Sequence, residues 1–193
     1  IVSVDSAMVY KGLDIGTGKP TVEERTKVPH HLIDIRDIQE PYSAAEFMSD
    51  ALSIIEKITK RQHIPLLVGG TMLYFRVLQQ GLSSLRSDNQ KIRVQLLAEA
   101  SEKGWPAMHQ RLAMVDPKTA NRIHPNDTQR IQRALEVYEI TKKPMSDFFK
   151  VASHSPYHNS LLQHYQVHAF ALAPALRATL HQNIEKRFYQ MLD

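Results

Sequence analysis

The pattern of apolar and polar residues in the first part of the chain predicts short strands that alternate with helices. Ile1 to Val4 is an apolar run that ends at Asp5, and residues 64–68 form a second run that ends at Gly69. Apolar residues at helical spacing predict helices from about 44 to 61, opened by a Ser-x-x-Glu capping box, and from 71 to 81. Such fully apolar strands predict an α/β fold with a parallel sheet covered on both faces.

The pattern changes after residue 85, because only helical spacing is found from about residue 88 to residue 150. It predicts three helices, around 92–100, 108–115 and 131–140, and Asn126 with Gln129 is expected to cap the third. Strand character returns at 166–173, and a last helix follows Pro174 to the chain end. The predicted organisation is an α/β core of residues 1–85 and 151–193 with an all-helical insertion, residues 86–150.

Composition and charge narrow the function classes. The chain has 193 residues and no cysteine, which excludes disulfides and thiolate metal sites. It has no apolar run of about 18 residues, so no membrane contact and a cytoplasmic location are expected. The net charge is +4, and residues 86–150 hold 12 Lys/Arg against 8 Asp/Glu, while the remainder is balanced. This excess indicates either an anionic partner or an ordinary solvated helical face.

Asp5 is the first candidate for chemistry. It directly follows the apolar run at the chain start, and ligands of parallel α/β sheets bind beyond the carboxyl ends of the strands. A carboxylate there can accept a proton or hold a metal-bound water, although a helix cap or a turn residue would fit the same position.

Two glycine-containing loops are weaker candidates. Gly69-Gly70-Thr71 follows the second predicted strand, where the backbone can approach a ligand and a helix start can offer N–H groups to an anion. Thr71 is equally suited to be a plain N-cap. Gly16-Thr17-Gly18-Lys19 does not fit a Walker A loop, because Pro20 follows the lysine and no apolar helix begins there.

Basic and amide side chains in the second half of the chain suggest phosphate or base contacts. Gln129 and Arg133 are four residues apart and share a helical face, which is also typical of a solvated helix. Arg93 lies beside an apolar stripe and by itself indicates little. Arg187 is embedded in the last apolar stripe, where a basic side chain either aims at a phosphate or extends to solvent. The ten histidines are not expected to form a metal site.

Several segments, in this order, resemble the tRNA dimethylallyltransferase (tRNA isopentenyltransferase) family. The matching segments occur in family order across nearly the whole chain. They are Val4 to Pro20 (VDSAMVYKGLDIGTGKP), Pro29 to Asp34 (PHHLID), Tyr42 to Phe47 (YSAAEF), Val68 to Tyr74 (VGGTMLY) and, between Ile123 and Glu136, IHPND, QR and RALE. An ordered set of this kind is far more specific than any single motif.

The resemblance implies an enzyme that transfers a dimethylallyl group from dimethylallyl diphosphate to the exocyclic amine of the adenine 3′-adjacent to the tRNA anticodon. It implies a P-loop NTPase-like α/β core with a helical insertion, Mg²⁺ as cofactor and the anticodon stem-loop as partner. We expect a monomer. The implied catalytic residues are Asp5, as general base, and Thr71. The implied tRNA contacts are Asp5, Ser6, Ala7, Met8, Thr71, Arg93, Gln129, Arg130, Ile131, Gln132 and Arg133, and Arg187 is a weaker match to a diphosphate-binding position.

One departure from the family pattern concerns the P-loop, which in the family precedes the Asp-Ser-Ala segment. We expect that strand and loop, and a C-terminal part, to be missing from this chain. The chain alone is therefore expected to be inactive and to hold no metal ligand.

Three rival functions share parts of these features. A P-loop small-molecule or nucleotide kinase has the same core layout, a non-catalytic tRNA-binding fragment would lack the P-loop, and a relative that prenylates free adenine nucleotides would use similar chemistry. The basic helical insertion favours tRNA as the acceptor over small molecules.

Overall fold

The computed structural model describes residues 1–81, 89–152 and 160–192. The chain forms two compact units, one from Ile1–Gly81 with Asn159–Asp193 and one from Leu82–His158. The predicted insertion, 86–150, falls within the second unit, and its predicted start lies outside the described residues. Among the described ranges, no helix has the length and apolar character needed to cross a membrane.

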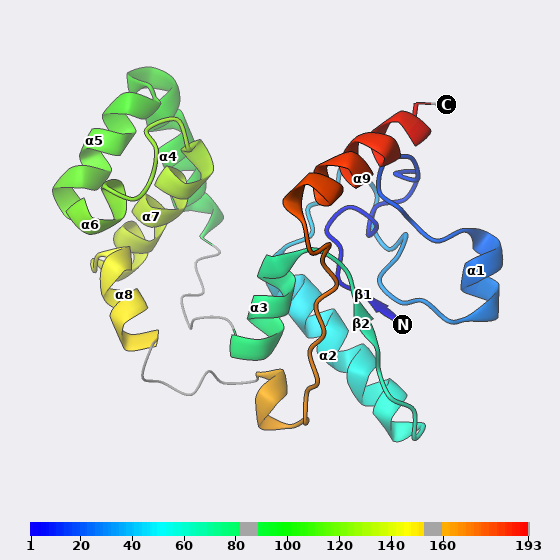
Figure 1. Ribbon diagram of the computed structural model, residues 1–193. Coiled ribbons are helices and arrows are strands. Elements are labelled where there is room, and N and C mark those ends of the chain that lie inside the picture. The colour runs from blue at the N-terminus through cyan, green and yellow to red at the C-terminus, as the bar shows by residue number, and fades with distance from the viewer. Residues whose placement is uncertain (82–88, 153–159, 193) are drawn as a thin grey trace. The chain divides into compact units, whose positions relative to one another are not determined.

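A parallel strand pair organises the first unit (Figure 1). β1 (Val2–Ser3) pairs in parallel with β2 (Leu67–Val68), and the N–H of Val4 donates to the carbonyl of Val68 at 2.7 Å. The predicted parallel pairing is confirmed, although both strands are shorter than their apolar runs. β1 is buried, whereas 49% of Val68 is exposed, so the expected cover on both faces is not present over β2.

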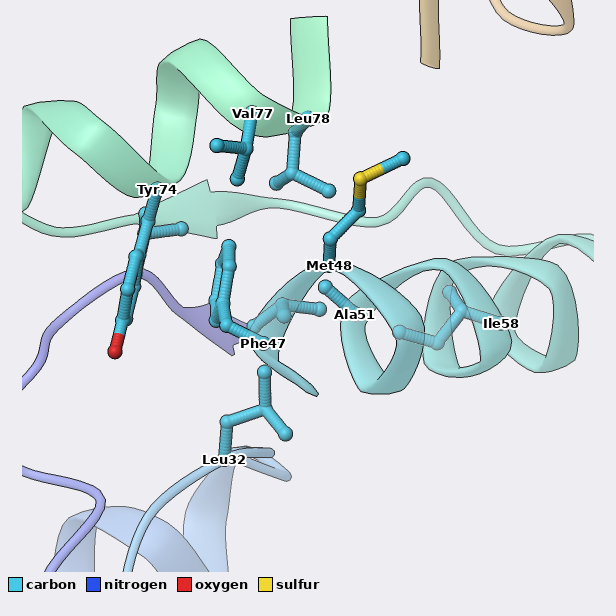
Figure 2. Close-up of a cluster of buried hydrophobic side chains, with 10 residues drawn as sticks. Leu32, Phe47, Met48, Ala51, Ile58, Tyr74, Val77 and Leu78 are labelled. Atoms are coloured by element: carbon cyan, nitrogen blue, oxygen red, sulfur yellow. The ribbon is translucent and has the colours of Figure 1, made fainter. Parts of the chain in front are cut away.

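Helices α2 (Ala44–Lys60) and α3 (Met72–Gln80) supply most of the core of this unit. The predicted Ser-x-x-Glu capping box is confirmed, since Ser43 and Glu46 cap α2 through reciprocal hydrogen bonds. The rings of Phe47 and Tyr74 are stacked, as Figure 2 shows. Their centroids are 4.1 Å apart. The buried cluster around them consists of Val2, Val4, Leu32, Met48, Ala51, Ile58, Val77 and Leu78.

Two other parts of the first unit differ from the prediction. The helix α1 (Val22–Lys27) was not predicted, although Thr21 and Glu24 form a capping box that is visible in the sequence. The strand predicted at 166–173 is wrong: this segment makes no ladder with β1 or β2, and a strand exists only where a neighbour satisfies its N–H and C=O groups.

The chain end of the first unit is helical as predicted. The short helix η1 (Leu161–Gln163) packs against α3, and α9 (Arg177–Gln190) begins three residues after Pro174. No residue of α9 is buried. Within the described part of the chain, the apolar side chains whose spacing predicted this helix are therefore not buried.

The second unit contains only helices in its described residues, as predicted. They are α4 (Gln90–Lys103), α5 (Trp105–Val115), α6 (Pro117–Ala120), α7 (Thr128–Thr141) and α8 (Met145–Ala152). α6 and α8 were not predicted. The expected cap of α7 is wrong by one residue, because the carboxylate of Asp127, not Asn126, accepts the N–H of Arg130.

Asp116 is a buried carboxylate that joins two helix starts of the second unit. Its side chain accepts hydrogen bonds from the Thr119 N–H (3.1 Å) and hydroxyl (2.6 Å), at the start of α6, and from the Ser146 N–H of α8 (2.9 Å). Burial alone would raise the pKa of Asp116, but these donors outweigh it and lower the pKa below its ordinary value. The ionised carboxylate therefore stabilises the folded unit.

We expect Asp116→Asn to lower the free energy of unfolding by about 1–3 kcal/mol, because asparagine cannot accept all three bonds. The depressed folded pKa means that this contribution is fully present above the usual carboxyl pKa and is lost as pH falls through the folded value. The difference between wild type and variant should thus be constant near neutral pH and shrink in acid. Urea titrations followed by the fluorescence of Trp105, the single tryptophan, report on this unit. Glu102→Gln, on the exposed face of α4, is the control, and an equal loss in both variants would contradict the assignment.

Candidate active site at the ends of the parallel strands

The carboxyl ends of β1 and β2 lie unusually close to each other. The Thr71 N–H donates to the Val4 carbonyl at 3.1 Å. A Cβ atom at Gly69 would lie 2.1 Å from that same carbonyl oxygen, whereas one at Gly70 would meet nothing within 4 Å. Only glycine fits at position 69, because any side chain there would push the strands apart.

Asp5 follows Val4 at this edge of the sheet and is partly exposed. Its Oδ1 accepts hydrogen bonds from the N–H groups of Ala7 (2.8 Å) and Met8 (3.1 Å). Its Oδ2 has no hydrogen-bond partner within the described residues. The carboxylate is therefore held by one oxygen and can present the other to a ligand, so the turn role and the catalytic role are compatible.

Thr71 is tied to the Asp5 segment and does not cap its own helix. Its side chain makes no capping bond to α3. Instead Oγ1 accepts the Ser6 N–H at 3.0 Å and donates to the Ser6 hydroxyl at 3.3 Å. The structure thus brings together Asp5, Ser6 and Thr71, which are up to 66 positions apart in the sequence and belong to one predicted site.

The phenol of Tyr74 stays neutral. Burial is the main cause that raises the pKa of Tyr74, and electrostatic interactions with Tyr10 and Asp5 add to it. The neutral ring stacks on Phe47 within the core of the first unit.

Lys19 lies in the glycine loop that does not fit a Walker A motif, and the structure shows a different role for it. Its side chain is only 3% exposed, and Nζ donates to the Tyr10 carbonyl (2.9 Å), to Asp14 (2.7 Å) and to Asp34 (2.6 Å). The N–H of Asp34 in turn donates to the Met8 carbonyl at 3.1 Å. Lys19 therefore fixes the loop beside the Asp5 segment. Sequence reasoning missed this role, for which the two aspartates were the available signal.

Arg187 of α9 lies against the glycine loop that precedes Lys19. A Cβ atom at Gly18 would come within 2.8 Å of its Nη2. No hydrogen bond or ion pair of its guanidinium is found within the described ranges. Arg187 is therefore available to an anion at this loop.

The predicted RNA contacts of the second unit lie on α4 and α7. Arg93 is exposed and Arg133 is partly exposed, and both bind Glu136, at 3.1 Å and 3.2 Å. Gln129 and Arg130 are exposed, and Gln132 is partly exposed. Ile131 differs, because its side chain is fully buried in the helical core. It therefore stabilises the fold and cannot reach an RNA.

The described residues offer no ready-made metal cage. No group of three or more His, Asp or Glu side chains that could hold an ion occurs within residues 1–81, 89–152 and 160–192. Any metal ion at this site would therefore need ligands from a substrate or from other residues.

The chain matches a known protein family over most of its length. The model of the family described as IPP transferase matches residues 8–193. The chain belongs to the IPP transferase family. tRNA dimethylallyltransferase 2 of Hahella chejuensis (strain KCTC 2396) is 50% identical to this family member over 200 aligned positions, which cover 100% of the chain and 60% of that relative. The chain thus spans about 60% of the length of this relative.

The fold of the chain is also similar to solved structures of tRNA prenyl- and isopentenyltransferases. A eukaryotic dimethylallyltransferase acting on tRNA has a TM-score of 0.76 at 29% identity, over 99% of this chain and 46% of that one. The tRNA delta(2)-isopentenylpyrophosphate transferase of Staphylococcus epidermidis has a TM-score of 0.52 at 35% identity, over 99% and 60%. This IPP transferase family member therefore has a helix-rich fold with a small parallel sheet in common with solved tRNA-modifying enzymes.

The glycine pair offers a test of the site geometry. We expect Gly69→Ala to lower the free energy of unfolding by about 1–3 kcal/mol or more, because its methyl group overlaps the Val4 carbonyl. Gly70→Ala is the matched control and should leave stability unchanged. Urea unfolding followed by far-UV circular dichroism measures both. Equal stability of the two variants would show that the strand ends are not in contact.

Proposed function

We propose that the intact protein containing this chain transfers a dimethylallyl group from dimethylallyl diphosphate to the exocyclic amine of the adenine 3′-adjacent to the anticodon of a tRNA. The observation that carries the proposal is the Asp5 carboxylate, fixed through one oxygen at the strand ends and open at the other, next to Thr71. The name of the relative that is 50% identical supports the same reaction.

Asp5 acts in this mechanism as the general base. The adenine amine is a weak nucleophile, because its lone pair is delocalised into the ring. As nitrogen bonds to the allylic carbon, the carbon–oxygen bond to diphosphate breaks, and the amine proton passes to Oδ2 of Asp5. Thr71 and Ser6 keep the carboxylate segment and the substrate base aligned. This alignment increases the rate of the reaction, because it lowers the entropy cost of bringing the reacting groups together.

RNA recognition is assigned to the Asp5–Met8 segment and to the basic second unit. The target base must leave its stack to reach Asp5, at a cost of a few kcal/mol that protein contacts have to offset. Arg93, Gln129, Arg130, Gln132 and Arg133 supply charge and amide groups at the surface of α4 and α7 for phosphate and base contacts.

The diphosphate is proposed to lie at a P-loop within a P-loop NTPase-like core, with Arg187 nearby. Mg²⁺ is proposed as cofactor because it would neutralise the leaving group when bound. The described residues form no cage for it, so no residue of this chain is assigned to it and no step depends on it here. We propose the cytoplasm as the place where the protein acts on tRNA, and the mechanism needs only one subunit.

A nucleotide kinase, the main rival from the sequence, is not favoured. The named relatives are prenyl- or isopentenyltransferases.

Asp5→Asn tests the base assignment in the intact protein. Asparagine keeps an oxygen for the Ala7 and Met8 amides but cannot accept the proton, so turnover should fall by about 10²–10⁴-fold. The assay follows labelled dimethylallyl into a tRNA with adenine 3′ of the anticodon, and filter binding checks that tRNA affinity stays near that of wild type.

Asp37→Asn is the control for the loss of one negative charge in the same unit. Asp37 is exposed and pairs with Lys11, which is not assigned to the reaction, so this variant should keep its activity. Near-normal turnover of Asp5→Asn would refute the role of Asp5 as base. Absence of transfer by the wild type would refute the reaction itself.

A further inference from the structure

Glu136 is a buried acid for which the proposed reaction has no use. It lies on α7 between Leu135 and Val137, which are both fully buried, and its own side chain is only 1% exposed. An unpaired charge in such a place would be strongly destabilising, so other groups must compensate the charge of Glu136.

Two arginines from different helices satisfy this carboxylate. Arg93 of α4 donates Nε to Oε1 at 3.1 Å, and Arg133 of α7 donates Nη1 to Oε2 at 3.2 Å. Each carboxylate oxygen thus holds one guanidinium. The arginines themselves extend outward, since 53% and 39% of their side chains are exposed.

We propose that Glu136 is a positioning residue for RNA binding, which holds Arg93 and Arg133 in place to receive phosphate groups of the tRNA. This inference rests on the proposed function. A guanidinium has five N–H donors, so its bond to Glu136 does not by itself use up its capacity for a phosphate. An arginine that is already ordered loses less side-chain entropy when the RNA binds. Glu136 would therefore increase affinity although it carries a negative charge.

The sign of this effect separates positioning from simpler roles. If Glu136 only reduced the local positive charge, its neutralisation would tighten binding to any RNA. If it only fastened α4 to α7, its replacement would lower stability and leave the RNA affinity of the folded protein unchanged. Positioning alone predicts weaker binding after a negative charge has been removed.

The experiment uses Glu136→Gln in the intact protein and a fluorescently labelled tRNA anticodon stem-loop. We expect Kd to rise about tenfold, because glutamine has only one acceptor oxygen for two guanidiniums. The slope of log K against log salt concentration should become shallower by about one for each phosphate that the arginines no longer bind. Trp105 fluorescence shows beforehand that the second unit is folded.

Glu139→Gln is the matched control. Glu139 lies on the same helix and pairs with Arg111 and Lys142, which are not assigned to RNA. This variant changes the charge equally, and it should bind the stem-loop as tightly as wild type or slightly tighter. A tenfold loss in Glu139→Gln as well would overturn the proposal, because the effect would then not be specific to the two arginines.

Two further variants keep the test decisive if Glu136→Gln does not fold. Glu136→Asp keeps the charge but is too short to hold both guanidiniums, so it should also weaken binding and reduce the salt slope. In an Arg93→Gln background, in which Arg133 still pairs with the acid, Glu136→Asp should cause a smaller loss than in wild type, because part of its effect acts through Arg93. Wild-type affinity of Glu136→Asp, or full additivity, would overturn the proposal.

The outcome also separates this inference from the proposed function. If the wild type binds and prenylates tRNA while Glu136→Gln binds at least as tightly, only the positioning role is wrong. If the wild type does not bind tRNA, both proposals fail.

Discussion

The carbonyl group of Val4 is the point on which the first unit depends. Its oxygen accepts the N–H that starts α3, and it lies so close to Gly69 that no side chain fits between them. This contact aligns the end of β1 with the end of β2. Asp5 and Thr71 are the residues that follow, so their meeting is a direct consequence of a backbone contact.

The second unit depends on buried acids in place of a backbone contact. Asp116 joins the starts of α6 and α8, and Glu136 of α7 joins its helix to α4 through Arg93. A charge in a helical core is tolerated only when hydrogen bonds satisfy it, so each acid fixes the positions of its partners. The partners of Glu136 are arginines that extend to the surface. Glu136 therefore links the packing of the helical core to the arrangement of basic groups that an RNA would meet.

Local signals in the sequence were sufficient for most of the helices and for the strand ends. The capping box of Ser43 predicted the start of α2, and the apolar run before Asp5 predicted its place at a strand end. Segment 166–173 shows the limit, because an extended apolar pattern becomes a strand only beside a pairing partner. The bond of Thr71 to Ser6 could not be predicted either, since it joins residues that only the fold brings together.

The central claim is that Asp5 removes the proton from the adenine amine. A structure of the intact protein with a tRNA anticodon stem-loop and an unreactive analogue of dimethylallyl diphosphate would test it most directly. We expect the adenine amine nitrogen within about 2.6–3.2 Å of the Asp5 carboxylate, with Oδ1 still bound to the Ala7 and Met8 amides. An amine beyond hydrogen-bond reach of Asp5, with another side chain as its acceptor, would contradict this role.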